Sequence, residues 1–171
     1  AYTNVFLSNE QAAMAIAEKR VKGVAITGSE RAGAAVASEA GKALKKSTME
    51  LGGSDAFIVL DDADMDTAVK WGLWGRMNNT GQCCVAAKRF ILHEKIADAF
   101  LGRFREELEK LRPGDPMDVT MTIGPLCTAG AMKLVQTQIQ QAVEGGAKVL
   151  MGGQRLDHTG YFLQPTILTE I

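Results

Sequence analysis

Two adjacent cysteines follow a run of polar, turn-forming residues. The run covers residues 78–82, Cys83 and Cys84 come next, and the apolar Val85 follows them. A thiol at a helix start or among N–H donors has a lowered pKa and becomes a usable thiolate nucleophile. A free cysteine can equally pack as a small buried hydrophobic residue. Local composition leaves both interpretations open.

Glu50 is a second candidate for chemistry. It ends a predicted strand and precedes Gly52 and Gly53. A carboxylate at such a place can face a cleft and act as a general base. An acidic residue about 20 positions after a glycine turn can instead hold a ribose hydroxyl. A solvent-exposed strand end is the third interpretation, and spacing alone does not choose among the three.

The glycine turn in question comprises residues 28–33. It follows a short apolar run and opens a predicted helix, so its free N–H groups could hold a phosphate. Gly28, Ser29 and Gly33 are present, but one glycine of the usual dinucleotide fingerprint is missing. An ordinary strand–helix turn, with Gly33 packing the helix, explains the same residues.

Composition narrows the classes of partner. The 171 residues are 46% hydrophobic and 23% charged, with a formal net charge of −1, which is ordinary for a globular protein. We therefore expect neither a nucleic-acid nor a membrane partner. Three cysteines without zinc-site spacing predict no metal centre, no disulfide framework and a reducing, cytoplasmic setting.

The elements that must position these residues alternate between strands and helices. Continuous apolar runs predict strands buried on both faces of parallel sheets, and hence an α/β fold. The Gly52-Gly53 pair is the predicted domain boundary. We expect helices over residues 9–20, 32–46, 64–77, 97–111 and 132–142, and strands over 24–26, 48–51, 57–60, 89–93, 148–151 and 161–167.

Several motifs in order resemble the aldehyde dehydrogenase superfamily. They are Ile-Thr-Gly-Ser at 26–29, Met-Glu-Leu-Gly-Gly at 49–53, Asn-Thr-Gly-Gln-Cys-Cys at 79–84, Gly-Pro-Leu at 124–126 and Gly-Tyr-Phe at 160–162. The resemblance extends along the whole chain. The motifs are most similar to those of the succinate-semialdehyde dehydrogenase branch.

The resemblance implies roles for single residues. Cys84 would be the nucleophile and Glu50 the base that activates water. Gly28 and Ser29 would lie at the diphosphate of NAD or NADP, Gly33 would pack the helix, and Leu51 would lie beside the nicotinamide. Asn78, Cys83 and Val85 would line the tunnel for a small aldehyde, namely succinate semialdehyde or a similar semialdehyde.

The resemblance also implies a fold and an assembly. Residues 1–51 would end a Rossmann-type cofactor domain, and residues 52–171 would form most of a parallel-sheet catalytic domain. Family elements that supply the oxyanion-hole Asn, the nicotinamide-ribose contact and the oligomerisation strand have no counterpart here. We expect an internal portion of a longer homo-oligomeric enzyme, inactive alone. The alternative is a non-catalytic structural or interaction module.

One departure concerns the substrate. A group within that branch holds the substrate carboxylate with an Arg six residues before the nucleophile. Asn78 occupies that place here, and Arg76 lies two residues earlier. The motifs also leave the choice between NAD and NADP open.

Overall fold

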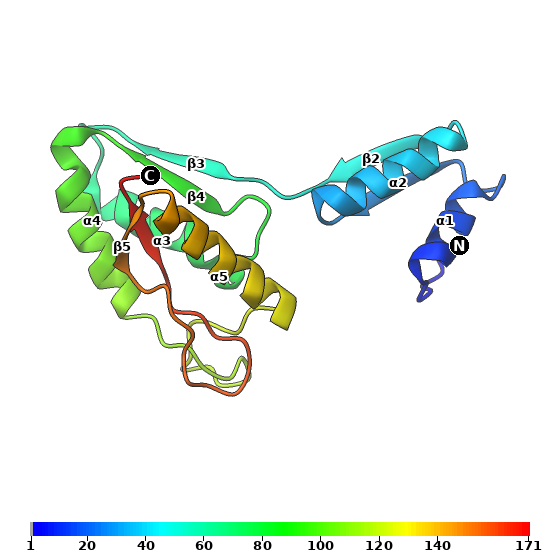
Figure 1. Ribbon diagram of the computed structural model, residues 1–171. Coiled ribbons are helices and arrows are strands. Elements are labelled where there is room, and N and C mark those ends of the chain that lie inside the picture. Colours follow the sequence, from blue (N-terminus) through cyan, green and yellow to red (C-terminus); the bar gives the residue numbers. More distant parts are fainter. Residues whose placement is uncertain (1) are drawn as a thin grey trace. The chain divides into compact units, whose positions relative to one another are not determined.

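The computed structural model describes residues 2–171 and contains two compact units. The first unit ends at Gly53 and the second begins at Ser54 (Figure 1), two residues beyond the predicted boundary. The elements in chain order are α1 (Asn9–Ala17), β1 (Gly23–Thr27), α2 (Glu30–Lys42), β2 (Lys46–Glu50), β3 (Asp55–Val59), α3 (Met65–Met77), the 3₁₀ turn η1 (Asn78–Gly81), β4 (Ala87–Leu92), α4 (Glu94–Glu109), α5 (Ala129–Glu144), β5 (Lys148–Met151) and β6 (Ile167–Thr169).

The first unit is built on the parallel pair β1–β2, which α2 connects. Residues pair in register from Gly23 with Lys46 to Thr27 with Glu50. Exposed and half-buried residues alternate along β1. The expectation of a strand buried on both faces is therefore wrong for β1, because α2 packs onto only one face of this two-stranded sheet.

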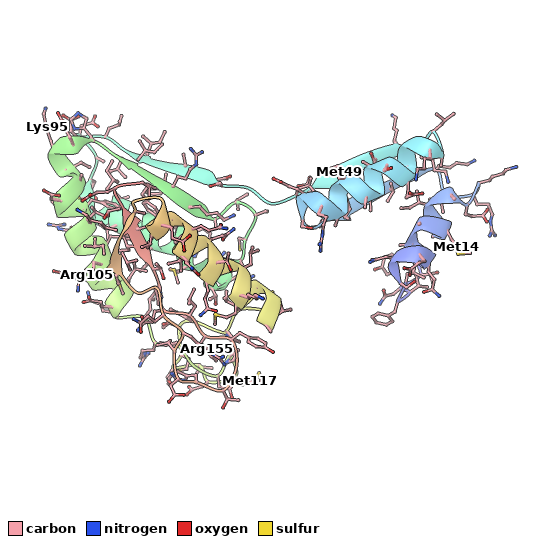
Figure 2. All side chains as sticks on the ribbon, viewed as in Figure 1. Met14, Met49, Lys95, Arg105, Met117 and Arg155 are labelled. Carbon is pink, nitrogen blue, oxygen red and sulfur yellow. The ribbon has the colours of Figure 1, made fainter. Side chains whose placement is uncertain are left out.

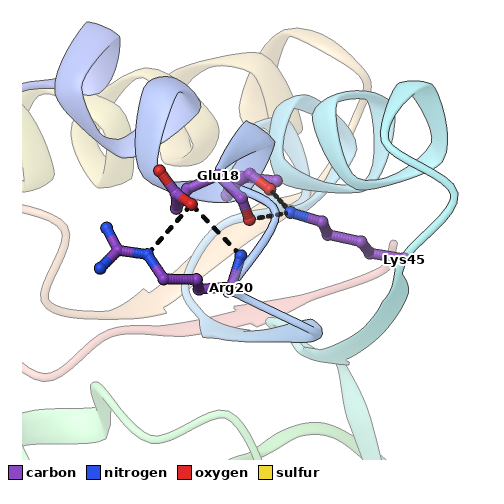
Figure 3. A network of polar contacts seen from close by, with 4 residues as sticks. Glu18, Arg20 and Lys45 are labelled. Carbon is purple, nitrogen blue, oxygen red and sulfur yellow. Dashed lines mark hydrogen bonds and ion pairs between the residues drawn. The ribbon is translucent and has the colours of Figure 1, made fainter.

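A lysine fixes the end of α1, which stops at Ala17 rather than continuing to residue 20. The Lys45 ammonium donates to the backbone carbonyls of Ile16 and Glu18 (Figure 3). The last carbonyls of a helix lack intrahelical partners, and a cation there satisfies them. The Glu18 carboxylate pairs with Arg20 at 3.1 Å, so the chain leaves the helix through a short polar network.

The second unit has its core between the parallel pair β3–β4 and two helices, α3 and α4, on one face (Figure 1). On the opposite face Ile58 is 63% exposed and its register partner Ile91 is 48% exposed. Burial on both faces is thus wrong for these strands as well. The buried core residues are Val59, Val69, Phe100, Phe104, Leu108 and Ile167.

The expectation of parallel sheets is confirmed for β1–β2 and β3–β4 and is wrong for β5–β6, which is antiparallel. Parallel neighbours need a long crossover, usually helical. Here the connection between the strands contains no helix, and Gly152 and Gly153 turn the chain with φ of +74° and +87°. A Cβ at Gly152 would lie 2.0 Å from the Pro165 carbonyl oxygen, so only glycine allows this return.

The helix that leads into the cysteine segment begins at a capped N-terminus. The Asp64 carboxylate accepts a hydrogen bond from the Thr67 N–H at 2.8 Å, and hydrogen bonding by Thr67 lowers the pKa of Asp64. An acidic N-cap satisfies a free N–H and favours the positive helix end. This capping accounts for Asp64 at the start of α3.

None of the helices within residues 2–171 has the length and apolar character that a membrane crossing requires. The His, Cys, Asp and Glu side chains of these residues form no group of three that could hold a metal ion.

The aromatic core predicts a large effect of one truncation. Phe100 is fully buried, with ring centroids 5.4 Å from Phe104 and 6.0 Å from Phe90. Phe100→Ala should lower the free energy of unfolding by about 3–5 kcal/mol, because it leaves a cavity. Denaturant titration measures this loss. Met117→Ala, at a residue 86% exposed (Figure 2), should stay within about 0.5 kcal/mol; equal losses would contradict the packing described.

Candidate active site

The segment that carries the cysteines begins with an unusual backbone turn between α3 and β4. Asn79, Thr80 and Gly81 have φ values of 50°, 57° and 74°. The left-handed conformation costs a non-glycine residue roughly 1–2 kcal/mol, and the branched Thr80 tolerates it worse than Asn79. Contacts elsewhere must therefore hold this turn.

Three side chains provide those contacts. Arg76, in the last turn of α3, donates to the Gly81 carbonyl at 3.3 Å. Thr80 Oγ1 donates to the Gly124 carbonyl at 3.3 Å. Gln82 Oε1 accepts from the Cys127 N–H at 2.9 Å. The turn is thus fixed from α3 on one side and from residues 124–127 on the other.

The turn delivers four of the predicted site residues in one short stretch. Cys84 is exposed and lies in a turn before β4, not at the start of a helix. Cys83 is half-buried, and its thiol donates to the Asn78 carbonyl at 3.7 Å. Asn78 and Val85 are exposed. The two neighbouring thiols therefore have different surroundings, and Cys84 is the accessible one.

Arg76 is partly buried in the second unit. Burial lowers the pKa of its guanidinium. Within the described part of the chain its side chain pairs with no carboxylate and donates instead to the Gly81 carbonyl. Its geometry is that of a residue that holds the turn before the cysteines.

Glu50 and Gly28 are neighbours at one edge of the first unit. Thr27 pairs with Glu50 in the register of β1 and β2, and the Gly28 N–H donates to the Glu50 carbonyl at 3.0 Å. The Glu50 side chain is exposed. Because the strands are parallel, their carboxyl ends bring the candidate base and the glycine turn to the same edge.

The start of α2 is the candidate position for a cofactor diphosphate. Gly28 and Ser29 are exposed, and the Ser29 hydroxyl caps the helix by accepting from the Ala32 N–H at 3.3 Å. The Gly28 N–H is already used by Glu50, so any phosphate would meet the first N–H groups of α2 instead. The exposed cation of Arg31 stands in this first turn.

Gly33 and Leu51 touch within the first unit. Gly33 is buried in α2, and a Cβ there would lie 2.7 and 2.9 Å from the two Leu51 methyl carbons. Leu51 is half-buried by this contact. Gly33 therefore lets the helix approach the residue that follows Glu50.

Gln82 is a residue of the candidate site that the sequence motifs did not predict. Its side chain contacts backbone groups about 45 residues away in the sequence. The available signal was a long amide placed directly before the two cysteines, within an otherwise turn-forming run.

Comparison with known proteins identifies the class. The model of the aldehyde dehydrogenase family matches residues 3–171. The chain belongs to the aldehyde dehydrogenase family.

Particular relatives refine this placement. A succinate-semialdehyde dehydrogenase (NADP+) of Deinococcus radiodurans is 49% identical over 171 residues, which are 100% of this chain and 36% of the relative. A succinate semialdehyde dehydrogenase (NAD(P)+) of Escherichia coli is 44% identical over 95% of this chain and 35% of its own length. The Streptococcus pyogenes succinic semialdehyde dehydrogenase, solved with NADP+, has a TM-score of 0.93 and 48% identity, covering 96% of this chain and 36% of that one. The chain spans about a third of the length of these relatives.

The Gly33–Leu51 contact yields a paired prediction. Gly33→Ala should leave the free energy of unfolding about 1 kcal/mol or more below that of Gly41→Ala, because the Leu51 methyl carbons must move to admit the added methyl. Gly41→Ala in the same helix meets nothing within 4 Å and should gain up to about 1 kcal/mol from helix propensity. Urea titration of both variants measures the difference. Equal changes in both variants would contradict the close approach.

Proposed function

We propose that this chain carries the thiol and the base of an NAD(P)-dependent aldehyde dehydrogenase that oxidises succinate semialdehyde or a similar semialdehyde to the acid. The supporting observation is the exposed Cys84 thiol on a fixed turn, in a chain of this family. The first unit would end the cofactor domain, and the second would belong to the catalytic domain.

Cys84 supplies the nucleophile. Its thiolate attacks the aldehyde carbon, and the resulting thiohemiacetal places a negative charge on the former carbonyl oxygen. The backbone N–H of Cys84 can donate to that oxygen, since fixed N–H donors stabilise such a charge. Cys83, whose thiol is directed to the Asn78 carbonyl, lines the approach with Asn78 and Val85.

Free thiols suit a reducing compartment, which supports a cytoplasmic location.

Oxidation leaves an acyl group on Cys84 as a thioester. A bound NAD or NADP would supply the hydride acceptor for this oxidation. Glu50 then takes a proton from water, and the hydroxide that forms attacks the thioester carbon. The Cys84 thiolate leaves, and the carboxylic acid is released. A soft thiol of this kind both attacks and leaves well.

The first unit supplies the groups that would hold the cofactor. The start of α2, with Gly28 and Ser29, would meet the diphosphate, and Leu51 would lie against the nicotinamide while Gly33 keeps the helix close. Relatives named for NADP+ and for NAD(P)+ support one of these two cofactors. Their names likewise support a semialdehyde substrate.

The nucleophile can be tested against its neighbour. Cys84→Ser should abolish reduction of NAD or NADP with succinate semialdehyde, whereas Cys83→Ser should retain most of it, because only the former removes the attacking thiolate. The rates are measured with the whole protein from the absorbance of the reduced cofactor. Butanal serves as a comparison substrate that lacks the carboxylate. Wild-type protein inactive with both substrates and both cofactors would favour the non-catalytic module.

The base can be separated from the oxidation step. Glu50→Gln should still give one rapid turnover of cofactor reduction, followed by a steady rate lowered by about 10²–10⁴-fold, because the thioester is no longer hydrolysed efficiently. Stopped-flow absorbance and intact mass spectrometry of the acylated protein follow the two phases. Loss of the first turnover would show that Glu50 acts before the thioester forms.

A further inference from the structure

The Gln82 amide joins the cysteine turn to a distant stretch of backbone. Its Oε1 accepts from the Cys127 N–H at 2.9 Å, and its Nε2 lies 3.3 Å from the Asn79 carbonyl and 3.4 Å from the Pro125 carbonyl. Each of these partners is a backbone group. The contact therefore depends on the path of the chain and not on the side chains at 125–127.

We propose that Gln82 is a positioning residue that sets the orientation of the Cys84 thiol by fixing its turn to residues 125–127. This inference rests on the proposed function. Gln82 stands two residues before Cys84 and directly after three left-handed residues, Asn79, Thr80 and Gly81. Without a fixed point after Gly81, those residues could relax toward ordinary conformations and carry Cys84 with them.

The hydrogen bonds of Gln82 argue against a direct catalytic role. A primary amide has two N–H donors and one carbonyl acceptor. Both donors face backbone carbonyls, and the acceptor is used by the Cys127 N–H. Gln82 thus has no spare donor to stabilise a developing oxyanion, and its effect must pass through the backbone.

The stretch that receives Gln82 is itself anchored in the second unit. Ile123 and Leu126 are buried, and the Leu126 N–H donates to the Tyr161 carbonyl at 2.9 Å. Thr80 adds a second link to the same stretch through the Gly124 carbonyl. Gln82 therefore fixes the turn to a support that the core holds, and not to a free loop.

Substitution by methionine removes all three contacts while keeping the length of the side chain. In the whole protein, Gln82→Met should lower kcat per reactive thiol by about 10–100-fold, as expected for a small misplacement of a nucleophile. The KM for NAD or NADP should stay within about twofold, because the cofactor groups lie in the first unit. The rate at which iodoacetamide alkylates Cys84 at neutral pH should also change. Peptide mass spectrometry measures that rate.

Two further variants make the result decisive. Gln82→Glu keeps the acceptor for the Cys127 N–H but turns an acceptor-only carboxylate oxygen toward the Asn79 and Pro125 carbonyls, so it should lose kcat as Gln82→Met does. Gln140→Met, which removes an exposed contact to Glu144 on α5, should change neither kcat nor Cys84 alkylation. A Gln82→Met protein with wild-type kcat and wild-type alkylation rate would overturn the proposal. So would a Gln82→Met protein that loses only thermal stability, or one whose loss of kcat equals that of Gln140→Met. If the wild type oxidises no aldehyde, the proposed function fails, and the alkylation rates still decide whether Gln82 sets the thiol.

Discussion

The left-handed turn at residues 79–81 is the constraint on which the thiol site depends. It redirects the chain from the end of α3 toward β4 within a few residues, and it ends just before the cysteines. A turn containing a branched residue in this conformation does not hold itself. Its geometry persists because Arg76 donates to the Gly81 carbonyl within the turn. Thr80 and Gln82 join the turn to the backbone of Gly124 and Cys127.

These contacts reach a stretch of chain with little regular structure. Residues 110–128 contain no helix or strand, yet they supply the backbone groups that Thr80 and Gln82 meet. Backbone pairing keeps the stretch in place: the Gly114 N–H donates to the Ile123 carbonyl, and Leu126 pairs with Tyr161. Loops placed by a rigid core commonly carry functional groups. Here such a loop supports one.

Local patterns predicted most elements, because spacing of apolar residues reports helices and strands directly. The patterns could not report how many faces each strand buries. Val24–Ile26 looks like a doubly covered strand, yet β1 has one covered face because α2 is its sole helical cover within the unit. The antiparallel return of β6 also escaped prediction, since it depends on Gly152 fitting against the Pro165 carbonyl.

The candidate site likewise contains residues that a local motif predicts and one whose role depends on partners distant in the sequence. Cys84, Glu50 and the glycine turn stand in short motifs that sequence alone displays, and their roles remain proposals. Gln82 gains its importance from partners more than 40 residues away, which no local pattern shows. Each half is nevertheless fixed inside its own unit: Glu50 by its ladder bond to Gly28, and Cys84 by the contacts of its turn. Because the two sets of contacts share no residue, a substitution in one half should leave the local geometry of the other intact. Defects in thiol attack and in water activation can therefore be assigned separately.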